Sequence, residues 1–276
     1  MPEATNIRKC KQLIKRLEKK AYFSVALTAY NEKLAEIQAA LMAENENEDI
    51  STRTSFIRIL PYLHDVMRLA QDRVEEYIQS RVESGEITNA DQARKSAAGN
   101  IFQQFFAYTL AQNIVHGNIT VPVVVTTSVR NIINEYAAIQ VDDDIQTPDS
   151  DVIVYSLLDE NSPILNFSCK TSCRERAGQT YKWKLLCDLA TCHCDHMEGN
   201  MNCPATRYHL QYVPTRPIKM CFVTADFYNE LNNPQISGLF HFFDYSYIAK
   251  QQSPDERIQP LQTIILDINE IFATNA

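Results

Sequence analysis

Hydrophobic and polar residues follow a helical pattern along the first part of the chain. Up to about residue 115 the apolar side chains recur three or four positions apart, the spacing of one buried helix face. Polar segments at 44–49 and 84–92 interrupt the pattern, and Pro61 should kink or break it. The pattern predicts helices over 8–20, 24–43, 54–83 and 91–114.

Short apolar runs bounded by turn-forming residues dominate the rest of the chain. They predict strands at 121–127, 151–158, 163–170 and 219–227, and two more near 239–248 and 261–268. Helices are expected at 131–139 and from about 174 to 190, and an acidic loop at 141–151. This order of elements indicates the α/β (α+β) class, with a mixed central β-sheet flanked by helices and a helical N-terminal region.

Composition excludes several classes of protein. The six glycines are never closer than 14 residues, which excludes a GxGxxG loop, a GxxxxGK phosphate loop and a GxSxG nucleophile elbow. A net charge of −8 argues against a non-specific nucleic-acid binder but allows a local basic cleft. No apolar run is long enough to cross a membrane, and the first residues contain no apolar signal core. We therefore expect a cytoplasmic protein whose eight cysteines are reduced thiols or metal ligands.

The strands predicted at 151–158 and 163–170 should form a hairpin through the turn 159–162. A turn centred between Glu160 and Asn161 places Asp151 opposite Lys170 at the open end, with Cβ atoms about 5 Å apart. The Asp could bind a hard divalent ion through oxygen, and the Lys could orient the hydrolytic water and stabilise the pentavalent phosphate. The alternative is a cross-strand ion pair, which contributes little to stability on a surface.

The residues around this hairpin resemble a nuclease signature. Pro148-Asp149, the run DVIVY at 151–155 and SCK at 168–170 resemble the PD-(D/E)xK pattern. The segment 170–176, KTSCRER, resembles the KxxxR(D/E)R element of type II restriction endonucleases that read CCGG-like sites, including interrupted ones. The resemblance covers about 95–190. It implies a restriction-endonuclease-like fold, a catalytic Lys170, and base reading by Arg174, Glu175 and Arg176.

The chemistry of this triplet suits base reading. The planar guanidinium of an arginine fits guanine O6 and N7, and a carboxylate accepts from cytosine N4. With Lys182 and Lys184, the arginines would concentrate positive charge in an acidic chain. By composition alone a solvated helix start is the simpler interpretation, but its position four residues after Lys170 favours recognition.

The chain departs from the group's pattern at the metal ligands. Ser168 stands where the signature has an acid, and the helix position that supplies a Glu in the group holds Trp183. The nearest acid on that helix is Asp188, and Gln103 replaces a Glu of an upstream helix. The resemblance therefore implies a catalytic set of Asp151, Lys170, Asp149 and Ser168, and Mg²⁺ ligands among Asp151, Asp149, Asp188 and Gln103.

A stretch rich in cysteine and histidine follows the predicted helix. Cys192, Cys194, His196 and Cys203 could bind a structural Zn²⁺, although their spacing is not that of a standard zinc finger. The alternative is a polar surface loop with reduced thiols.

These features lead us to expect a Mg²⁺-dependent type II restriction enzyme. It would hydrolyse double-stranded DNA at a palindromic CC:GG-containing site as a homodimer, because a two-fold target demands a two-fold protein. The resemblance also implies a cognate DNA methyltransferase, a prokaryotic cytoplasm and no membrane partner. We expect a helical region at 1–90 for dimerisation or DNA contact, and a nuclease domain at 91–276 with an insertion near 187–203. The alternatives are a non-catalytic zinc-containing DNA-binding protein and a repair-type nuclease with the same site.

Overall fold

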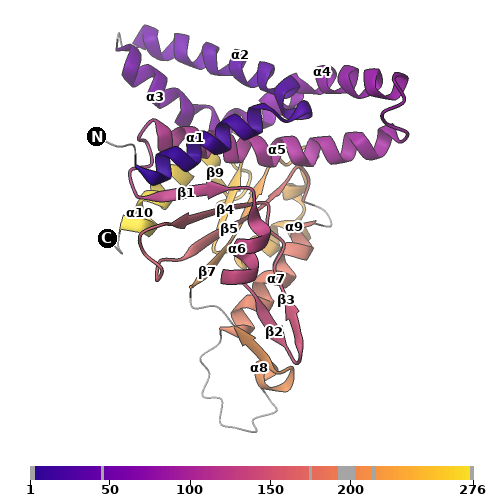
Figure 1. Ribbon diagram of the computed structural model, residues 1–276, viewed down its shortest axis with the longest axis vertical. Coiled ribbons are helices and arrows are strands. Elements are labelled where there is room, and N and C mark those ends of the chain that lie inside the picture. Colours follow the sequence, from indigo (N-terminus) through magenta and orange to yellow (C-terminus); the bar gives the residue numbers. More distant parts are fainter. Residues whose placement is uncertain (1–3, 45–46, 174–175, 192–202, 213–215, 274–276) are drawn as a thin grey trace.

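The computed structural model describes residues 4–44, 47–173, 176–191, 203–212 and 216–273. The chain begins with a helical region, as predicted (Figure 1). Asn47 and Asn89 cap the third and fifth helices through their side-chain oxygens, and Pro61 lies in a short 3-10 turn, η1 (Leu60–Tyr62), where the long predicted helix breaks. The helices are α1 (Thr5–Glu18), α2 (Ala21–Glu44), α3 (Glu48–Arg58), α4 (Leu63–Glu83) and α5 (Ala90–Val115).

A six-stranded mixed sheet forms the centre of the protein, which confirms the predicted class. Its order is β1-β4-β5-β7-β8-β9. The β1–β4 and β4–β5 pairs are antiparallel, whereas β5, β7, β8 and β9 run parallel. The strands are β1 (Val123–Thr126), β4 (Val152–Ser156), β5 (Ile164–Lys170), β7 (Ile218–Thr224), β8 (Tyr245–Ile248) and β9 (Gln259–Pro260).

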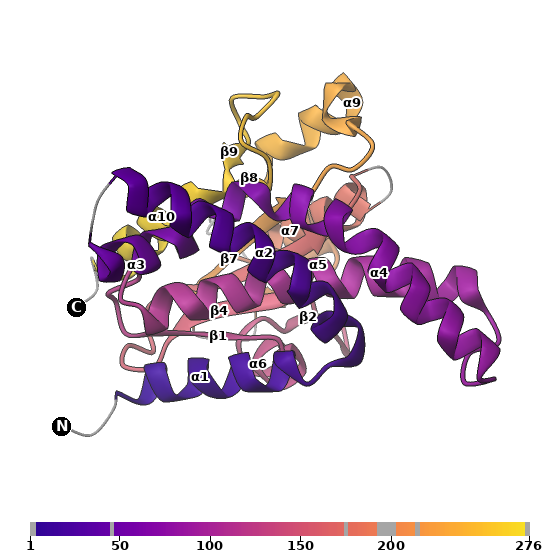
Figure 2. The same cartoon turned by 90° about the horizontal axis from the view of Figure 1, so that it is seen from above.

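Helices cover both faces of this sheet. Phe106 of α5 packs edge-on against Phe167 of β5, with ring centroids 5.1 Å apart. On the other face, the hydroxyls of Ser168 in β5 and Thr180 in α7 (Arg176–Ala190) are hydrogen-bonded at 2.9 Å. The main hydrophobic core contains residues of α1, α2, α4 and α5 together with strand residues and α10 (Ile264–Ala273). The division at residue 90 stays a prediction. Figures 1 and 2 show α4 and α5 extending together beyond the sheet.

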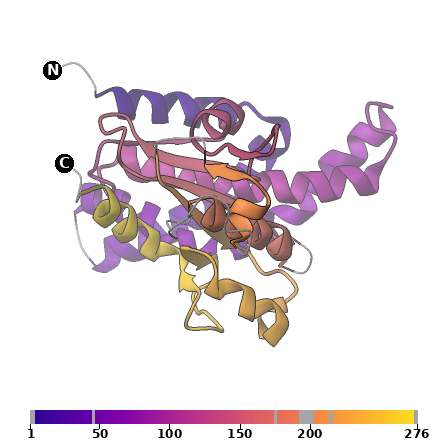
Figure 3. The same cartoon turned by 90° about the horizontal axis from the view of Figure 1, so that it is seen from below.

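A smaller sheet projects from the end of the large one. Its order is β3-β2-β6. It lies at the bottom of Figure 1 and therefore nearest the viewer in Figure 3, which looks from below. It comprises β2 (Ile139–Val141), β3 (Asp144–Gln146) and β6 (Leu210–Tyr212), with α8 (Pro204–Arg207) beside it and α6 (Val129–Tyr136) leading into β2. The segment 141–151, predicted as a loop, therefore contains a short strand. None of the described helices is both long and apolar enough to cross a membrane.

Two predicted strands near the C-terminus are wrong in whole or in part. Residues 264–273 form α10, in which Ile264, Ile265, Ile268 and Phe272 are buried at helical spacing. Within 239–248 only Tyr245–Ile248 is a strand, preceded by η3 (Gly238–His241), and α9 (Pro234–Ser237) lies just upstream. Short apolar runs do not distinguish a strand from a buried helix by periodicity, which explains both errors.

The predicted hairpin exists, but its register differs by two residues. Val152 pairs with Phe167 and Val154 with Leu165, so Asp151 is not the cross-strand partner of Lys170. The connecting loop is held by buried Arg216, whose guanidinium donates to the carbonyls of Ser162 and Asp159. Arg216 lies 54 residues after Ser162 in the sequence. The local turn propensity of residues 159–162 therefore could not predict this contact.

The contact between α5 and the sheet should dominate stability. Phe106→Ala is expected to lower the free energy of unfolding by about 3–5 kcal/mol, because the fully buried ring leaves a cavity over Phe167. Leu266→Ala is the control, since this side chain on α10 is 65% exposed and its loss should cost no more than about 0.5 kcal/mol. Urea denaturation measures both, and equal losses would contradict the packing described.

Candidate active site

Three charged side chains meet at the open end of the β4–β5 hairpin. The Lys170 Nζ atom lies 2.9 Å from Asp151 Oδ2 and 3.1 Å from Asp149 Oδ2. The Lys170 side chain is only 6% exposed, whereas those of Asp151 and Asp149 are 17% and 37% exposed. The structure thus brings these three predicted residues together despite the different register. Extended past Val152, the observed register would set Asp149, and not Asp151, opposite Lys170.

Backbone hydrogen bonds fix two members of this group, Lys170 and Asp151. Lys170 is the last residue of β5, and its carbonyl accepts a hydrogen bond of 3.1 Å from the Ala225 N–H, just after β7. Asp151 donates its N–H to the Phe167 carbonyl at 3.0 Å, and its Oδ2 accepts from the Cys169 N–H at 2.8 Å. The Asp151 carboxylate is therefore held by the strand as well as by the ammonium.

The electrostatics of the group keep Lys170 charged. Burial by itself would lower the pKa of the Lys170 ammonium, but the negative charges of Asp151 and Asp149 outweigh burial and hold that pKa above its ordinary value. Near neutral pH the side chain is accordingly a hydrogen-bond donor and a positive charge, and it is not a base.

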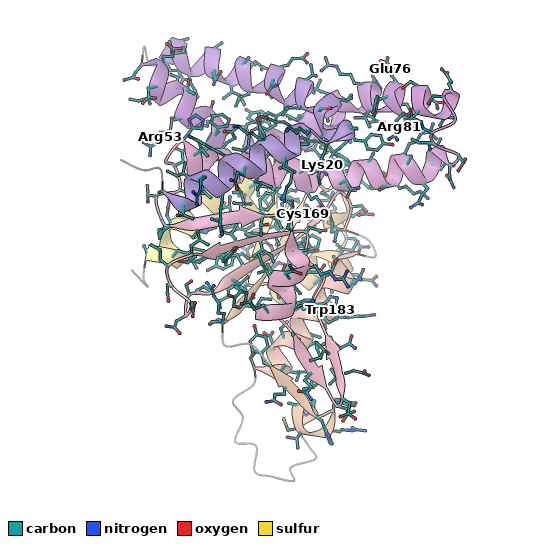
Figure 4. The ribbon with its side chains drawn as sticks, in the orientation of Figure 1. Lys20, Arg53, Glu76, Arg81, Cys169 and Trp183 are labelled. Carbon is teal, nitrogen blue, oxygen red and sulfur yellow. The ribbon has the colours of Figure 1, made fainter. Side chains whose placement is uncertain are left out.

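One member of the group, Asp149, borders a cleft of about 510 Å³ between α6, the segment 147–150 and α7. Asp149 lines the cleft, together with Arg130, Asn134, Gln179 and Trp183. Trp183, labelled in Figure 4, thus occupies the cleft wall from the helix position that carries a Glu in the CCGG-reading group, but an indole offers no metal ligand. Sequence analysis missed Arg130, Asn134 and Gln179 because they belong to no motif.

Two further predicted residues lie on β5 of the hairpin and on α5, which packs against it. Ser168 is buried and hydrogen-bonded to Thr180, so it links β5 to α7. Because side chains alternate along a strand, Lys170, two residues later, lies on the same face of the sheet. Gln103 is half-buried on α5, three residues before Phe106, and so lies on the same side of the helix. The N-terminal part of α5 lines a cavity with Phe227, whose N–H donates to the Thr171 carbonyl. Gln103 is therefore on the Phe167 face of the sheet, whereas Lys170 shares the opposite face with Ser168, and its role as a metal ligand stays a prediction.

The prediction of Asp188 as a metal ligand beside Lys170 is wrong. Its carboxylate is paired with Lys184, which also lies 3.3 Å from Asp244 Oδ2. Asp244 in turn accepts from the Met220 N–H at 2.8 Å. Met220 lies four residues before Thr224 on β7, and Thr224 is the residue that pairs with Lys170. Four strand residues span about 13 Å, so Asp188 belongs to the far end of the sheet. The same contacts occupy Lys184, which was expected to add positive charge to a DNA cleft.

Several predicted residues lie outside the description. Arg174 and Glu175 are not described, and Arg176 is described only as the first residue of α7. Of the proposed zinc ligands, Cys192, Cys194 and His196 are not described. Cys203 precedes α8, and a hydrogen bond from the Thr206 backbone lowers the pKa of its thiol. Zinc binding therefore stays a prediction.

A second cluster lies just beyond Lys170. Ligand atoms of Cys173, Asp226 and Glu230 lie within 4.8 Å of one another, as a metal site would require. However, Asp226 Oδ2 already pairs with Lys250 Nζ at 3.1 Å, and burial raises the pKa of the Cys173 thiol to about 12. A protonated thiol and a neutralised carboxylate fit a hydrogen-bonded cluster better than a metal centre.

Comparison with known proteins places the chain in a family. The family model described as "BsaWI restriction endonuclease type 2" matches residues 129–271, more than half of the chain, and this range includes Asp149, Asp151 and Lys170. A solved structure titled "Restriction endonuclease PspGI-substrate DNA complex" has a TM-score of 0.45 and 14% sequence identity, covering 88% of this chain and 93% of that chain. That likeness is too weak to carry an argument. No curated protein matches the sequence significantly. The match over the hairpin, the cleft and the parallel strands shows that the chain belongs to the BsaWI family of type 2 restriction endonucleases and is a type II site-specific deoxyribonuclease.

Proposed function

We propose that Asp149, Asp151 and Lys170 form the centre at which this enzyme hydrolyses phosphodiester bonds with the help of Mg²⁺. The observation that carries the proposal is one buried ammonium shared by two carboxylates, one of which, Asp149, lines an open cleft. A repair-type nuclease would use the same group, but the family match favours a restriction enzyme.

The donor set suits a hard divalent cation. Asp149 and Asp151 offer carboxylate oxygens, and Gln103 would add an amide oxygen from α5; Mg²⁺ prefers such ligands. Bound there, the ion would polarise the phosphate and lower the pKa of a coordinated water. The chain's own contribution is to hold the two carboxylates rigidly through Lys170 and the Cys169 N–H.

Lys170 acts on the phosphate as a donor. Because its side chain stays protonated, it stabilises the negative charge that builds up on the phosphate oxygens and orients the attacking water. Its neighbour Ser168 has a supporting role, since its hydroxyl is engaged by Thr180 within the fold.

Specificity would come from the residues directly after this group. Arg174, Glu175 and Arg176 follow Cys173 and lead into α7, and we assign them the reading of CC:GG base pairs. A palindromic site of this kind requires a homodimer, and a host that makes the enzyme requires a methyltransferase that protects the same site. A structural Zn²⁺ in the segment 192–203 remains part of the proposal.

Removing the ammonium tests the catalytic assignment. Lys170→Met should reduce Mg²⁺-dependent plasmid cleavage by at least about 10²–10³-fold, the usual effect of removing one charge-stabilising donor. DNA binding in Ca²⁺ should change little, because one phosphate contact among many is lost. Lys219→Met is the matched control, since this half-exposed lysine pairs with Asp244 at the far end of β7. Cleavage by Lys170→Met at the wild-type rate would remove the proposal.

Trp183 offers a direct probe of the cleft because it is the single tryptophan of the chain. If DNA occupies the cleft that Asp149 and Trp183 line, a saturating cognate duplex in Ca²⁺ should protect the indole from acrylamide quenching and shift its emission. Fluorescence titration measures this, with binding followed independently by anisotropy of labelled DNA. Saturated binding with unchanged tryptophan quenching would place the DNA elsewhere.

If the triplet reads bases, its arginine variants should lose more affinity for the cognate duplex than for scrambled DNA. Arg174→Ala and Arg176→Ala should each weaken binding to the cognate site by about 1–3 kcal/mol more than binding to scrambled DNA. Lys182→Ala, on the exposed side of α7, should weaken both alike and reduce the salt dependence, as expected of a phosphate contact. Gel-shift titrations in Ca²⁺ at two salt concentrations measure this. If the arginine variants lose equal affinity for both duplexes, the triplet is only a basic helix start and does not read bases.

A further inference from the structure

The loop after β7 holds the short segment that connects Lys170 to α7. The Ala225 N–H donates to the Lys170 carbonyl at 3.1 Å, and the Phe227 N–H donates to the Thr171 carbonyl at 3.0 Å. The Cys173 N–H donates to Glu230 Oε2 at 2.5 Å. The segment 170–173 is therefore bound to this loop at both of its ends.

The start of α7 depends on the same contact. The N–H of Ala177, the second residue of α7, donates to the Cys173 carbonyl at 3.1 Å. The Cys173 thiol is buried and lies 3.3 Å from the Thr224 hydroxyl of β7. Glu230 and Thr224 thus fix the backbone and the side chain of the residue immediately before Arg174.

The loop itself is kept in place by one cation. Lys250, which follows β8, donates to the Asp226 carbonyl at 2.7 Å, to Asp226 Oδ2 at 3.1 Å and to Asn229 Oδ1 at 3.0 Å. Asp226 and Asn229 both have left-handed backbone conformations, with φ of 45° and 52°, a region that non-glycine residues adopt uncommonly and Asp and Asn more readily than others. Lys250 contacts both of these residues, so it stabilises the two bends of the loop.

Asp226 transmits this support to Glu230. Its side chain is 2% exposed, and its Oδ1 accepts from the Glu230 N–H at 2.8 Å while its Oδ2 pairs with Lys250. A buried carboxylate without a cation is costly, so Lys250 is required for this arrangement. The contacts form one continuous chain from Lys250 through Asp226 and Glu230 to Cys173.

We propose that Lys250, Asp226 and Glu230 are positioning residues that set the geometry between Lys170 and the start of α7, and that this geometry determines how strongly cleavage depends on the correct base sequence. The inference rests on the proposed function, in which the group that acts on the phosphate and the groups that read the bases are only a few residues apart. A misplacement of about 1 Å at a reacting group can cost about a hundredfold in rate. A rigid connection would therefore pass a displacement caused by a mismatched base contact on to Lys170.

The test compares cleavage of a cognate duplex with cleavage of duplexes that carry one mismatched base pair. In Glu230→Ala the ratio of kcat/KM on the two should fall about tenfold or more, with cognate kcat reduced and KM little changed, because Cys173 loses its anchor. Glu230→Gln should keep most of the discrimination, since its amide oxygen can still accept from the Cys173 N–H. Glu76→Ala, an exposed site on α4 labelled in Figure 4, is the matched control and should behave as wild type.

A second pair of variants tests the other end of the chain of contacts. Lys250→Met should lower the ratio as Glu230→Ala does, and Lys250→Arg should restore much of it because the positive charge is kept. If the Ala and Met variants do not fold, amide exchange of the wild-type protein decides. A protected Cys173 amide supports the anchor, and an amide that exchanges as fast as an exposed loop overturns it.

The outcomes separate this inference from the proposed function. Folded Glu230→Ala and Lys250→Met proteins with wild-type discrimination overturn the positioning role alone. A wild-type enzyme that cuts at no fixed sequence overturns the proposed function, and the positioning role with it.

Discussion

The candidate active site depends on one buried ammonium between two carboxylates. An unpaired charge as enclosed as that of Lys170 would be strongly destabilising, so Asp149 and Asp151 are needed for the fold as well as for any chemistry. Asp151 also accepts from the Cys169 N–H, which ties the charge pair to the strand. The groups proposed to bind Mg²⁺ and the phosphate are therefore preorganised, and the free energy of folding holds them in place.

The rest of the structure supports this hairpin from several elements. On one face α5 packs through Phe106, and on the other α7 is hydrogen-bonded through Thr180. The helical region reaches the same point through α4, because His64 Nδ1 donates to the Ala225 carbonyl at 2.7 Å. The Ala225 N–H then donates to the Lys170 carbonyl. The N-terminal helices thus contribute to the candidate site through the loop after β7, although none of their residues belongs to the charged group.

Local patterns in the sequence predicted most helices of the first half, the hairpin, and the grouping of Asp149, Asp151 and Lys170. Each of these depends on residues that are close in the sequence or on a strand end with a distinctive charge. The hairpin register was missed because Arg216, from a distant segment, holds the turn. Asp188 was misplaced because the rotation of α7 on the sheet follows from packing, and α10 was mistaken for a strand because its apolar run is short. The cleft wall could not be predicted, since residues of α6 and α7 come to line one cleft only in the folded chain.

The most direct test of the account is to sequence the ends produced when the purified enzyme digests a plasmid in Mg²⁺. We expect every end to derive from one two-fold symmetric sequence containing CC and GG, and we expect no cleavage when the ion is removed by chelation or when Lys170 is replaced by Met. Ends of unrelated sequence, or undiminished cutting by the Lys170→Met protein, would contradict the claim that this charged group is the centre of a sequence-specific nuclease.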